Sequence, residues 1–167
     1  MSALSREVYA IQNPALCAVL LWRFACAYNQ HHPNRDHVPL LLFFIVLPMV
    51  LHRATLDVIV ATRNQSGLRA CVAKFSASKE NKQDIVLAIH DRAGRLRQLS
   101  LEAIKTGVST RLLHVAPNSQ VIPLSLTEPS ANFTKAITPL IKGAERLGYW
   151  FSQLSIHEIA VILKVRF

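Results

Sequence analysis

The first long apolar segment of the chain has hardly a polar interruption. It runs from Asn13 to Tyr28 (NPALCAVLLWRFACAY) and carries a single charge, Arg23. Asn13 is a good helix cap, and Pro14 occupies the first helical position, where its missing N–H costs nothing. Because the apolar residues cover most of the circumference, the pattern predicts a helix that is buried on more than one side. The polar segment from Asn29 to His37 then predicts a loop.

A second run, Val38 to Leu51 (VPLLLFFIVLPMVL), is almost wholly apolar. It is shorter than the roughly 20 residues that span a bilayer, so it favours a buried core helix over about 39–53. A role at a membrane surface is the alternative. Pro48 predicts a kink or a break in this helix. The next segment, 55–61, fits either a helical turn or a short strand, and a further helix is predicted over 66–75.

Helical spacing of apolar residues is longest from Asp84 to Thr106, which predicts one long helix with Gly107 as its left-handed C-terminal cap. Two short apolar segments, 111–115 and 120–124, flank a turn and predict a β-hairpin. Pro123 indicates an edge position for the second strand.

The last part of the chain returns to helical spacing. It predicts helices over 132–151 and 155–163. Ser155 and Glu158, three residues apart, have the form of a capping box at the start of the second of these helices.

The order of these elements predicts a mainly α fold with a small β-hairpin, in a single compact domain over 1–167. It comprises an N-terminal tail (1–12), a helical core (13–106), the hairpin (107–126) and C-terminal helices (130–167). Three helices followed by a two-stranded hairpin give the outline of a winged helix, although many α+β domains share that outline.

Charge is concentrated in the middle of the chain. The net charge is +9, and residues 60–112 hold ten of the 19 basic residues but only four of the ten acidic ones. Lys and Arg neutralise phosphates, so basic side chains around the long helix and hairpin are candidates for nucleic-acid contact. Acidic residues share that helix and no aromatic residues are interleaved, so a solvated face is the alternative. The candidates are Lys79, Lys82, Arg92, Arg95, Arg97, Lys105 and Arg111.

The sequence offers little to a catalytic interpretation. It lacks the motifs of nucleophile elbows, P-loops, zinc-protease helices and dinucleotide-binding turns, so we expect no enzyme activity and no cofactor. The tightest group of potential metal ligands is His31, His32, Asp36 and His37. A short polar loop rarely supplies tetrahedral geometry, so we assign no metal site to it.

The three cysteines are odd in number and show no C-x-x-C spacing, which predicts neither a disulfide framework nor a zinc site and suits a reducing cytosol. Cys17, Cys26 and Cys71 lie among apolar neighbours, where cysteine usually acts as a small hydrophobe. The N-terminal segment lacks the apolar core of a signal peptide, so we expect a cytoplasmic protein.

Large aromatic side chains are abundant for a domain of this size. They predict either core packing or the centre of a protein interface, where aromatic residues are favoured. The candidate interface residues are Trp22, Phe43, Phe44, Tyr149, Trp150 and Phe151.

Three segments together resemble the middle component of three-component ABC systems. They are 13–28, 47–59 (LPMVLHRATLDVI) and 146–167 (RLGYWFSQLSIHEIAVILKVRF), in that family's order. The helix before Gly107 and the hairpin also fit. The resemblance implies a non-catalytic adaptor that docks on an SMC-like ABC ATPase and helps to hold an effector, often a nuclease, in a prokaryotic defence complex. A free-standing winged-helix DNA binder is the alternative function.

Overall fold

A computed structural model describes residues 12–75, 82–125 and 133–167. Its helices are α2 (Pro14–His31), α3 (Phe43–Val50), α4 (Arg53–Ala61), α5 (Gly67–Lys74), α6 (Lys82–Arg95), α7 (Arg97–Ser109), α8 (Thr138–Ser152) and α9 (Ile156–Leu163). Two short 3-10 turns, η1 (Leu40–Leu42) and η2 (Asn64–Ser66), and three short strands, β1 (Val38–Pro39), β2 (Leu113–Val115) and β3 (Gln120–Pro123), complete the described parts. A mainly helical single domain with a small sheet is therefore confirmed.

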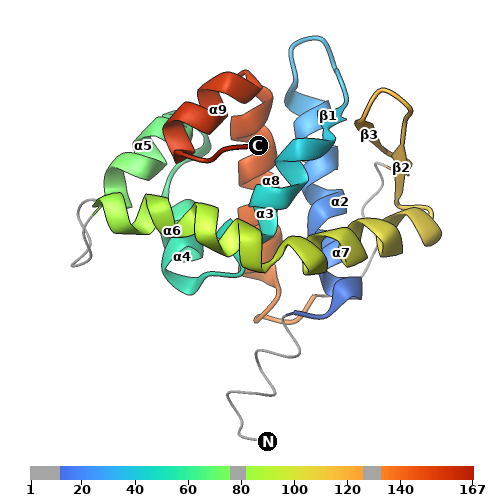
Figure 1. Ribbon diagram of the computed structural model, residues 1–167, viewed down its shortest axis with the longest axis horizontal. Helices are drawn as coiled ribbons and strands as arrows, with labels where there is room; N and C mark the ends of the chain where they lie inside the picture. Colours follow the sequence, from blue (N-terminus) through green and yellow to red (C-terminus); the bar gives the residue numbers. More distant parts are fainter. Residues whose placement is uncertain (1–11, 76–81, 126–132) are drawn as a thin grey trace, which may run out of the picture.

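Helix α2 is buried on more than one side, as its apolar circumference predicted. It lies beside α8 and is crossed by α7 (Figure 1), and these two helices make its largest contacts. The Asn13 side chain accepts a hydrogen bond from the Ala15 N–H at 2.8 Å and so caps the helix. In the core, the Phe24 ring meets Phe43 and Phe151 edge to face, with ring centres 5.4 and 5.7 Å apart. Such edge-to-face pairs add to the free energy of burial.

The second apolar run is mostly buried, with Leu41 exposed, but it is not one helix over 39–53. It forms β1, η1 and α3, and α3 continues through Pro48 to Val50. The chain then bends by 101° before α4. His52 causes this restart: its backbone is extended and its ring Nδ1 accepts the Thr55 N–H, which caps α4. The ambiguous segment 55–61 is therefore helical.

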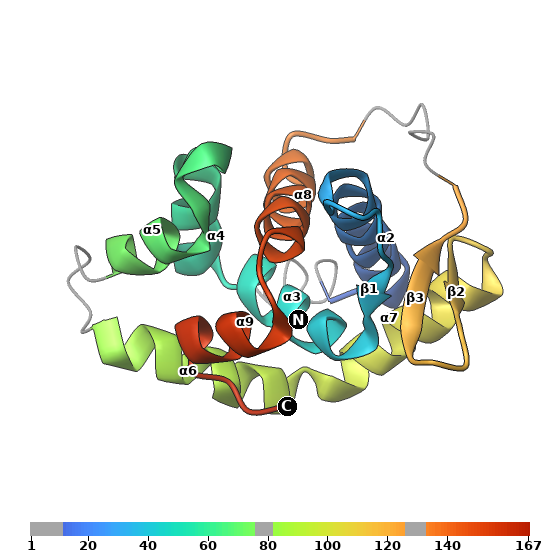
Figure 2. The same ribbon diagram turned by 90° about the horizontal axis from the view of Figure 1, so that it is seen from above.

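The predicted single helix over 84–106 is wrong in its continuity. Leu96 leaves the helical conformation (φ −95°, ψ 6°) and separates α6 from α7. The hydrogen bonds from Leu96 N–H to Arg92 O and from Ser100 N–H to Leu96 O, 2.8 and 2.9 Å, still link the two helices. They follow one another along one side of the molecule (Figure 2). Gly94, a weak helix former two residues earlier, is the sequence signal for this break.

Gly107 is not the left-handed cap that the sequence predicted. Helix α7 runs past it to Ser109, and Arg111 (φ 60°) is the left-handed residue. The N–H groups of Leu112 and Arg111 donate to the carbonyls of Gly107 and Val108, a Schellman motif. Gly107 serves packing instead, because a Cβ there would lie 2.9 Å from Leu113 Cδ1.

The hairpin is confirmed, but it belongs to a three-stranded antiparallel sheet in the order β1-β3-β2. Since Val38 pairs with Val121, β3 is the central strand and the edge position inferred from Pro123 is wrong. Pro123 is tolerated because it stands opposite Leu113 at a non-hydrogen-bonded pair of the β2 ladder, beyond the reach of β1. The winged-helix assignment stays a prediction.

The C-terminal helices differ from their predicted bounds by more than one residue only at the start of α8. Helix α8 begins at Thr138 rather than 132, and Asn132 lies outside the described residues. Pro139 explains the later start, since a residue without an N–H fits only the first turn of a helix. Helix α9 has the predicted capping box: Ser155 Oγ accepts the Glu158 N–H at 3.2 Å, and Glu158 accepts the Ser155 N–H at 2.9 Å.

Candidate interaction surfaces

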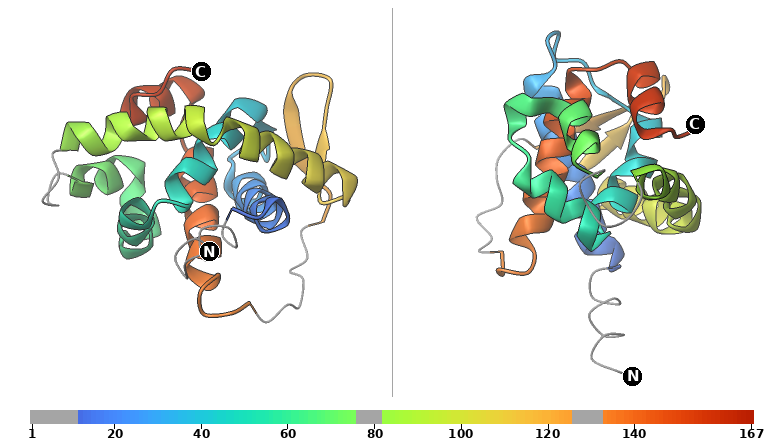
Figure 3. Two further views of the ribbon diagram at one scale, coloured as in Figure 1. Left: turned by 60° about the horizontal axis from the view of Figure 1, so that its bottom comes forward. Right: turned by 90° about the vertical axis from the view of Figure 1, so that its left-hand side faces the viewer.

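Four of the predicted nucleic-acid residues are exposed along the α6–α7 side of the molecule. Arg95 ends α6, Arg97 and Lys105 lie on α7, and Arg111 follows it. None of the four has an ion-pair partner among the residues that the structure describes. Figure 3 shows that α6 and α7 lie on the outside of the fold along its length. These cations are therefore available to an external anion.

The other predicted basic residues differ. Lys79 lies outside the described residues. Lys82 begins α6, but the structure describes only its backbone. Arg92 turns inward: its Nε donates to Pro48 O at 3.1 Å and its Nη2 to Thr55 Oγ1 at 3.3 Å. It thereby caps the end of α3 and joins α6 to α4, so Arg92 has a structural role.

Most of the candidate interface aromatics are core residues. Trp22, Phe43, Trp150 and Phe151 are at most 2% exposed. The two indoles also donate their N–H groups inside the fold, each at 2.8 Å, from Trp22 to Ser125 O and from Trp150 to Asn64 O. A partner could reach these four only by opening the core.

Phe44 and Tyr149 are half-buried, so they are the candidate aromatics that remain accessible at the surface. They lie in different hollows. Phe44 faces an apolar groove, and Tyr149 faces a polar cavity between α2 and α8.

The groove lies between the α6–α7 junction, η1 with the start of α3, and the segment after α9. Its volume is about 310 Å³. We call it the basic-rimmed groove and define it by its lining residues Leu41, Phe44, Ile45, His90, Ala93, Gly94, Arg97, Val165, Arg166 and Phe167. The sequence singled out Phe44 as an aromatic and Arg97 as a cation, but no sequence pattern could show that the two residues line one groove with the segment after α9.

The polar cavity has a volume of about 420 Å³ and is built around two arginines. Arg23 on α2 pairs with Glu145 on α8 at 2.5 Å. Arg146 Nη1 donates to the carbonyls of Ile59, Val60 and Thr62 at 3.1, 2.6 and 2.6 Å. These bonds satisfy the open carbonyls at the end of α4, so Arg146 lines the cavity as a helix cap.

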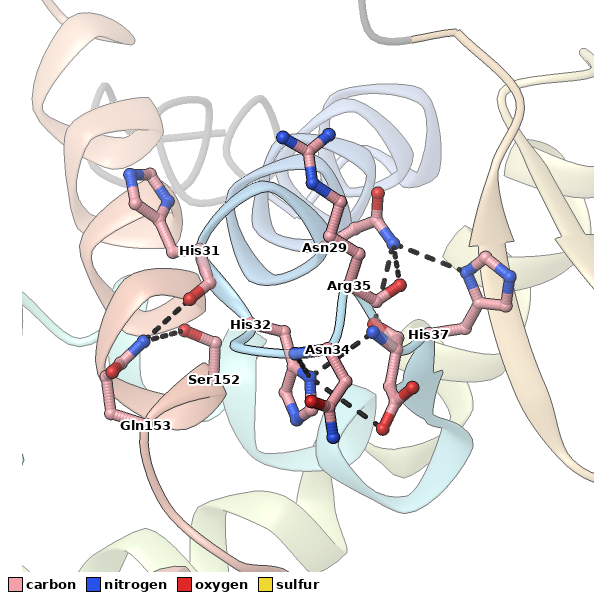
Figure 4. Close-up of polar contacts among 9 residues, drawn as sticks. Asn29, His31, His32, Asn34, Arg35, His37, Ser152 and Gln153 are labelled. Carbon is pink, nitrogen blue, oxygen red and sulfur yellow. Dashed lines mark hydrogen bonds and ion pairs between the residues drawn. The ribbon is translucent and has the colours of Figure 1, made fainter.

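Hydrogen bonds to histidine residues hold the backbone of the segment 31–37, at the end of α2 (Figure 4). His32 Nδ1 accepts the N–H groups of Asn34 and Asp36 at 3.3 and 3.2 Å. His31 Nδ1 lies 2.8 Å from Ala27 O, and the His31 carbonyl accepts the Gln153 amide at 2.8 Å. Within the described ranges, no group of three potential metal ligands converges.

A model of the ABC-three component (ABC-3C) system Middle Component 3 family matches residues 1–167. The chain belongs to this family. Searches of curated proteins and of solved structures returned no match to this middle component. The resemblance seen in the sequence is thus confirmed at the level of the family.

In the described part of this middle component, no single helix is long and apolar enough to cross a membrane. Leu40–Val50 and Arg53–Ala61 reach the required length and composition only together, across their 101° bend. All residues of α3 except the half-buried Phe44 are buried in the fold.

The cysteines of this middle component are thiols at neutral pH. Burial raises the pKa of Cys17 to about 12 and that of Cys71 to about 11. Burial also raises the pKa of Cys26 to about 11, although Arg23 beside it acts in the opposite direction. Since the thiolate is the nucleophile, none of the three is activated.

We therefore expect iodoacetamide at pH 7.5 to leave Cys17 and Cys71 unmodified in the folded chain and to modify Cys26 slowly, because only Cys26 is partly exposed. In denaturant all three should react at the rate of a free thiol. Mass spectrometry of tryptic peptides measures both rates, and a Cys26→Ser variant serves as the control. Fast alkylation of Cys17 in the folded protein would contradict this expectation.

Proposed function

We propose that this chain is a non-catalytic adaptor that joins an SMC-like ABC ATPase to an effector in a cytoplasmic defence complex of a prokaryote. The family match across residues 1–167 carries the proposal, because the family is defined as a component of ABC-three component systems. The protonated cysteines agree with a non-catalytic role.

An adaptor needs separate surfaces for two partners. The basic-rimmed groove lies on α3, α6 and α7, whereas the polar cavity lies on α2 and α8, and they share no lining residue. Both contain accessible aromatic side chains, Phe44 and Phe167 in the groove and Tyr149 in the cavity. These surfaces support contact with two different proteins at once.

Co-expression with the ATPase and the effector encoded beside it tests the proposal. Size-exclusion chromatography with light scattering should show one complex that contains all three chains. When this chain is left out, the effector should no longer co-elute with the ATPase. A monodisperse monomer of this chain in the presence of both proteins would refute the adaptor role.

The exposed cations on α6 and α7 favour a second candidate function, contact with duplex DNA. Arg95, Arg97, Lys105 and Arg111 supply four cations for phosphates. Each phosphate contact contributes about −0.9 to the slope of log K against log salt, so four contacts predict a loss of roughly a hundredfold between 50 and 200 mM salt.

Fluorescence anisotropy with a labelled duplex measures this salt dependence. We expect the triple variant R95A/R97A/K105A to weaken binding and to reduce the slope by about 2.7, because each of the three side chains accounts for about 0.9 of it. Arg92 is left intact because its hydrogen bonds stabilise the fold. Lys142→Ala, an exposed cation on α8, is the matched control. Affinity that does not change with salt would exclude this function.

A further inference from the structure

Two exposed large apolar side chains line the basic-rimmed groove. Leu41 and Phe167, which both line it, are 46% and 47% exposed, and Phe44 is half-buried. Below them, Ile45 and Val165 are buried and form an apolar floor. Large apolar side chains that gather around one hollow are typical of a binding site for another protein.

Hydrogen bonds hold the walls of the groove in place. Lys164 adopts the left-handed conformation (φ 51°), and the Val165 N–H donates back to Ala160 O at 3.1 Å. The Arg166 N–H then approaches His90 Nδ1 at 3.5 Å, which ties the segment after α9 to α6. A groove that is already formed costs little conformational entropy when a ligand binds.

The charged side chains among the described residues that line the groove are all basic. Arg97 and Arg166 are exposed at its rim together with His90, and no Asp or Glu belongs to the described residues that line it. The groove therefore complements a segment that carries acidic residues beside apolar ones. A second copy of this chain fits poorly, since a symmetric contact would bring the same arginines of both copies together.

We propose that the basic-rimmed groove binds an acidic amphipathic helix of a partner protein, with apolar side chains at i, i+4 and i+7 entering the groove and Asp or Glu facing Arg97 and Arg166. Helix-in-groove binding uses this spacing of anchors. The proposal deepens the proposed function, because the partner helix belongs to the ATPase or to the effector.

A direct test uses the isolated chain and two labelled peptides. Both are designed amphipathic helices with Leu at i, i+4 and i+7, one with Glu and one with Lys at the flanking positions. The Glu peptide should bind at least about tenfold more tightly, a difference of 1.4 kcal/mol. R97E/R166E should abolish this preference, whereas R63E/K74E, an equal change of charge at exposed positions before and within α5, should retain it. Equal binding of the two peptides would overturn the proposal.

A second test uses the complex with the ATPase and the effector. A photo-crosslinking residue at Leu41 should capture an acidic amphipathic segment of one partner, and the same residue at the exposed Leu124 should not. The proposal for the groove would be overturned if Leu41 captured a second copy of this chain, or if the complex were intact without capture at Leu41. Neither result would overturn the adaptor role. If the R97E/R166E variant no longer binds DNA but still forms the complex with both proteins, the two arginines would be assigned to DNA binding. If the isolated chain prefers the Glu peptide but no complex with the ATPase and the effector forms, the adaptor role alone would be refuted.

Discussion

Replacing Gly148 with alanine is expected to lower the free energy of unfolding by about 3 kcal/mol, the upper end of the usual range for overpacking. At Gly148, α8 lies close against α2. A Cβ there would overlap the Phe24 carbonyl oxygen and lie 2.9 Å from Ala27 Cβ and 3.0 Å from Tyr28 N. Two of these three atoms are backbone, so one of the two central helices would have to shift. Urea denaturation followed by circular dichroism measures the loss.

Two other glycines make this a graded series. At Gly143, also on α8, a Cβ would lie 2.5 Å from Leu56 Cδ1, which is the end of a flexible side chain, so Gly143→Ala should cost clearly less. At Gly94 no atom lies within 4 Å, and Gly94→Ala should stabilise α6 by up to about 1 kcal/mol through helix propensity. A cost at Gly143 equal to or larger than that at Gly148 would contradict the close approach of α2 and α8.

Removing the Arg146 side chain is expected to cost a similar amount, about 3 kcal/mol. In addition to the three carbonyls at the end of α4, its Nε donates to Asn64 Oδ1 at 2.7 Å. Arg146→Ala would leave part-buried carbonyls without a charged donor, and the desolvation of those carbonyls would remain. The same denaturation experiment measures the effect, and Trp150, whose indole bonds Asn64 O, reports it by fluorescence.

Two further variants separate geometry from charge. Arg146→Lys keeps the charge but cannot place donors at both Nη1 and Nε, so we expect it to recover about half of the loss. Lys142→Ala removes an exposed cation one turn earlier on α8 and should change stability by less than about 0.5 kcal/mol. If Arg146→Ala matched Lys142→Ala, the capping role of Arg146 would be wrong.

Local signals in the sequence were reliable where the relevant contact is itself local. Asn13 and Ser155 cap α2 and α9 as predicted, because a cap bonds an N–H two or three residues away. Pro139 indicates the true start of α8, but the spacing of apolar residues before it suggested an earlier start of the helix. Gly107 misled the prediction, since glycine serves a cap and a close packing contact equally well, and only Leu113 decides between them.

Candidate surfaces depended on distant contacts. Arg92 and Arg97 are both basic residues of one predicted helix, yet Arg92 caps α3 while Arg97 lines a groove with Arg166. The same holds for the aromatics: Phe43 is buried and its neighbour Phe44 reaches the surface. Composition predicted that such residues exist, but it could not say which of them face outward.

The sequence by itself determined the family, the mainly helical class, the hairpin and the burial of α2, because these follow from periodicity, from caps and from residue order. The tertiary structure decided the break at Leu96, the third strand, the closeness of α2 and α8 at Gly148, and the groove that joins Leu41 to Phe167. Each of these depends on atoms that are far apart along the chain and come together only when the core packs.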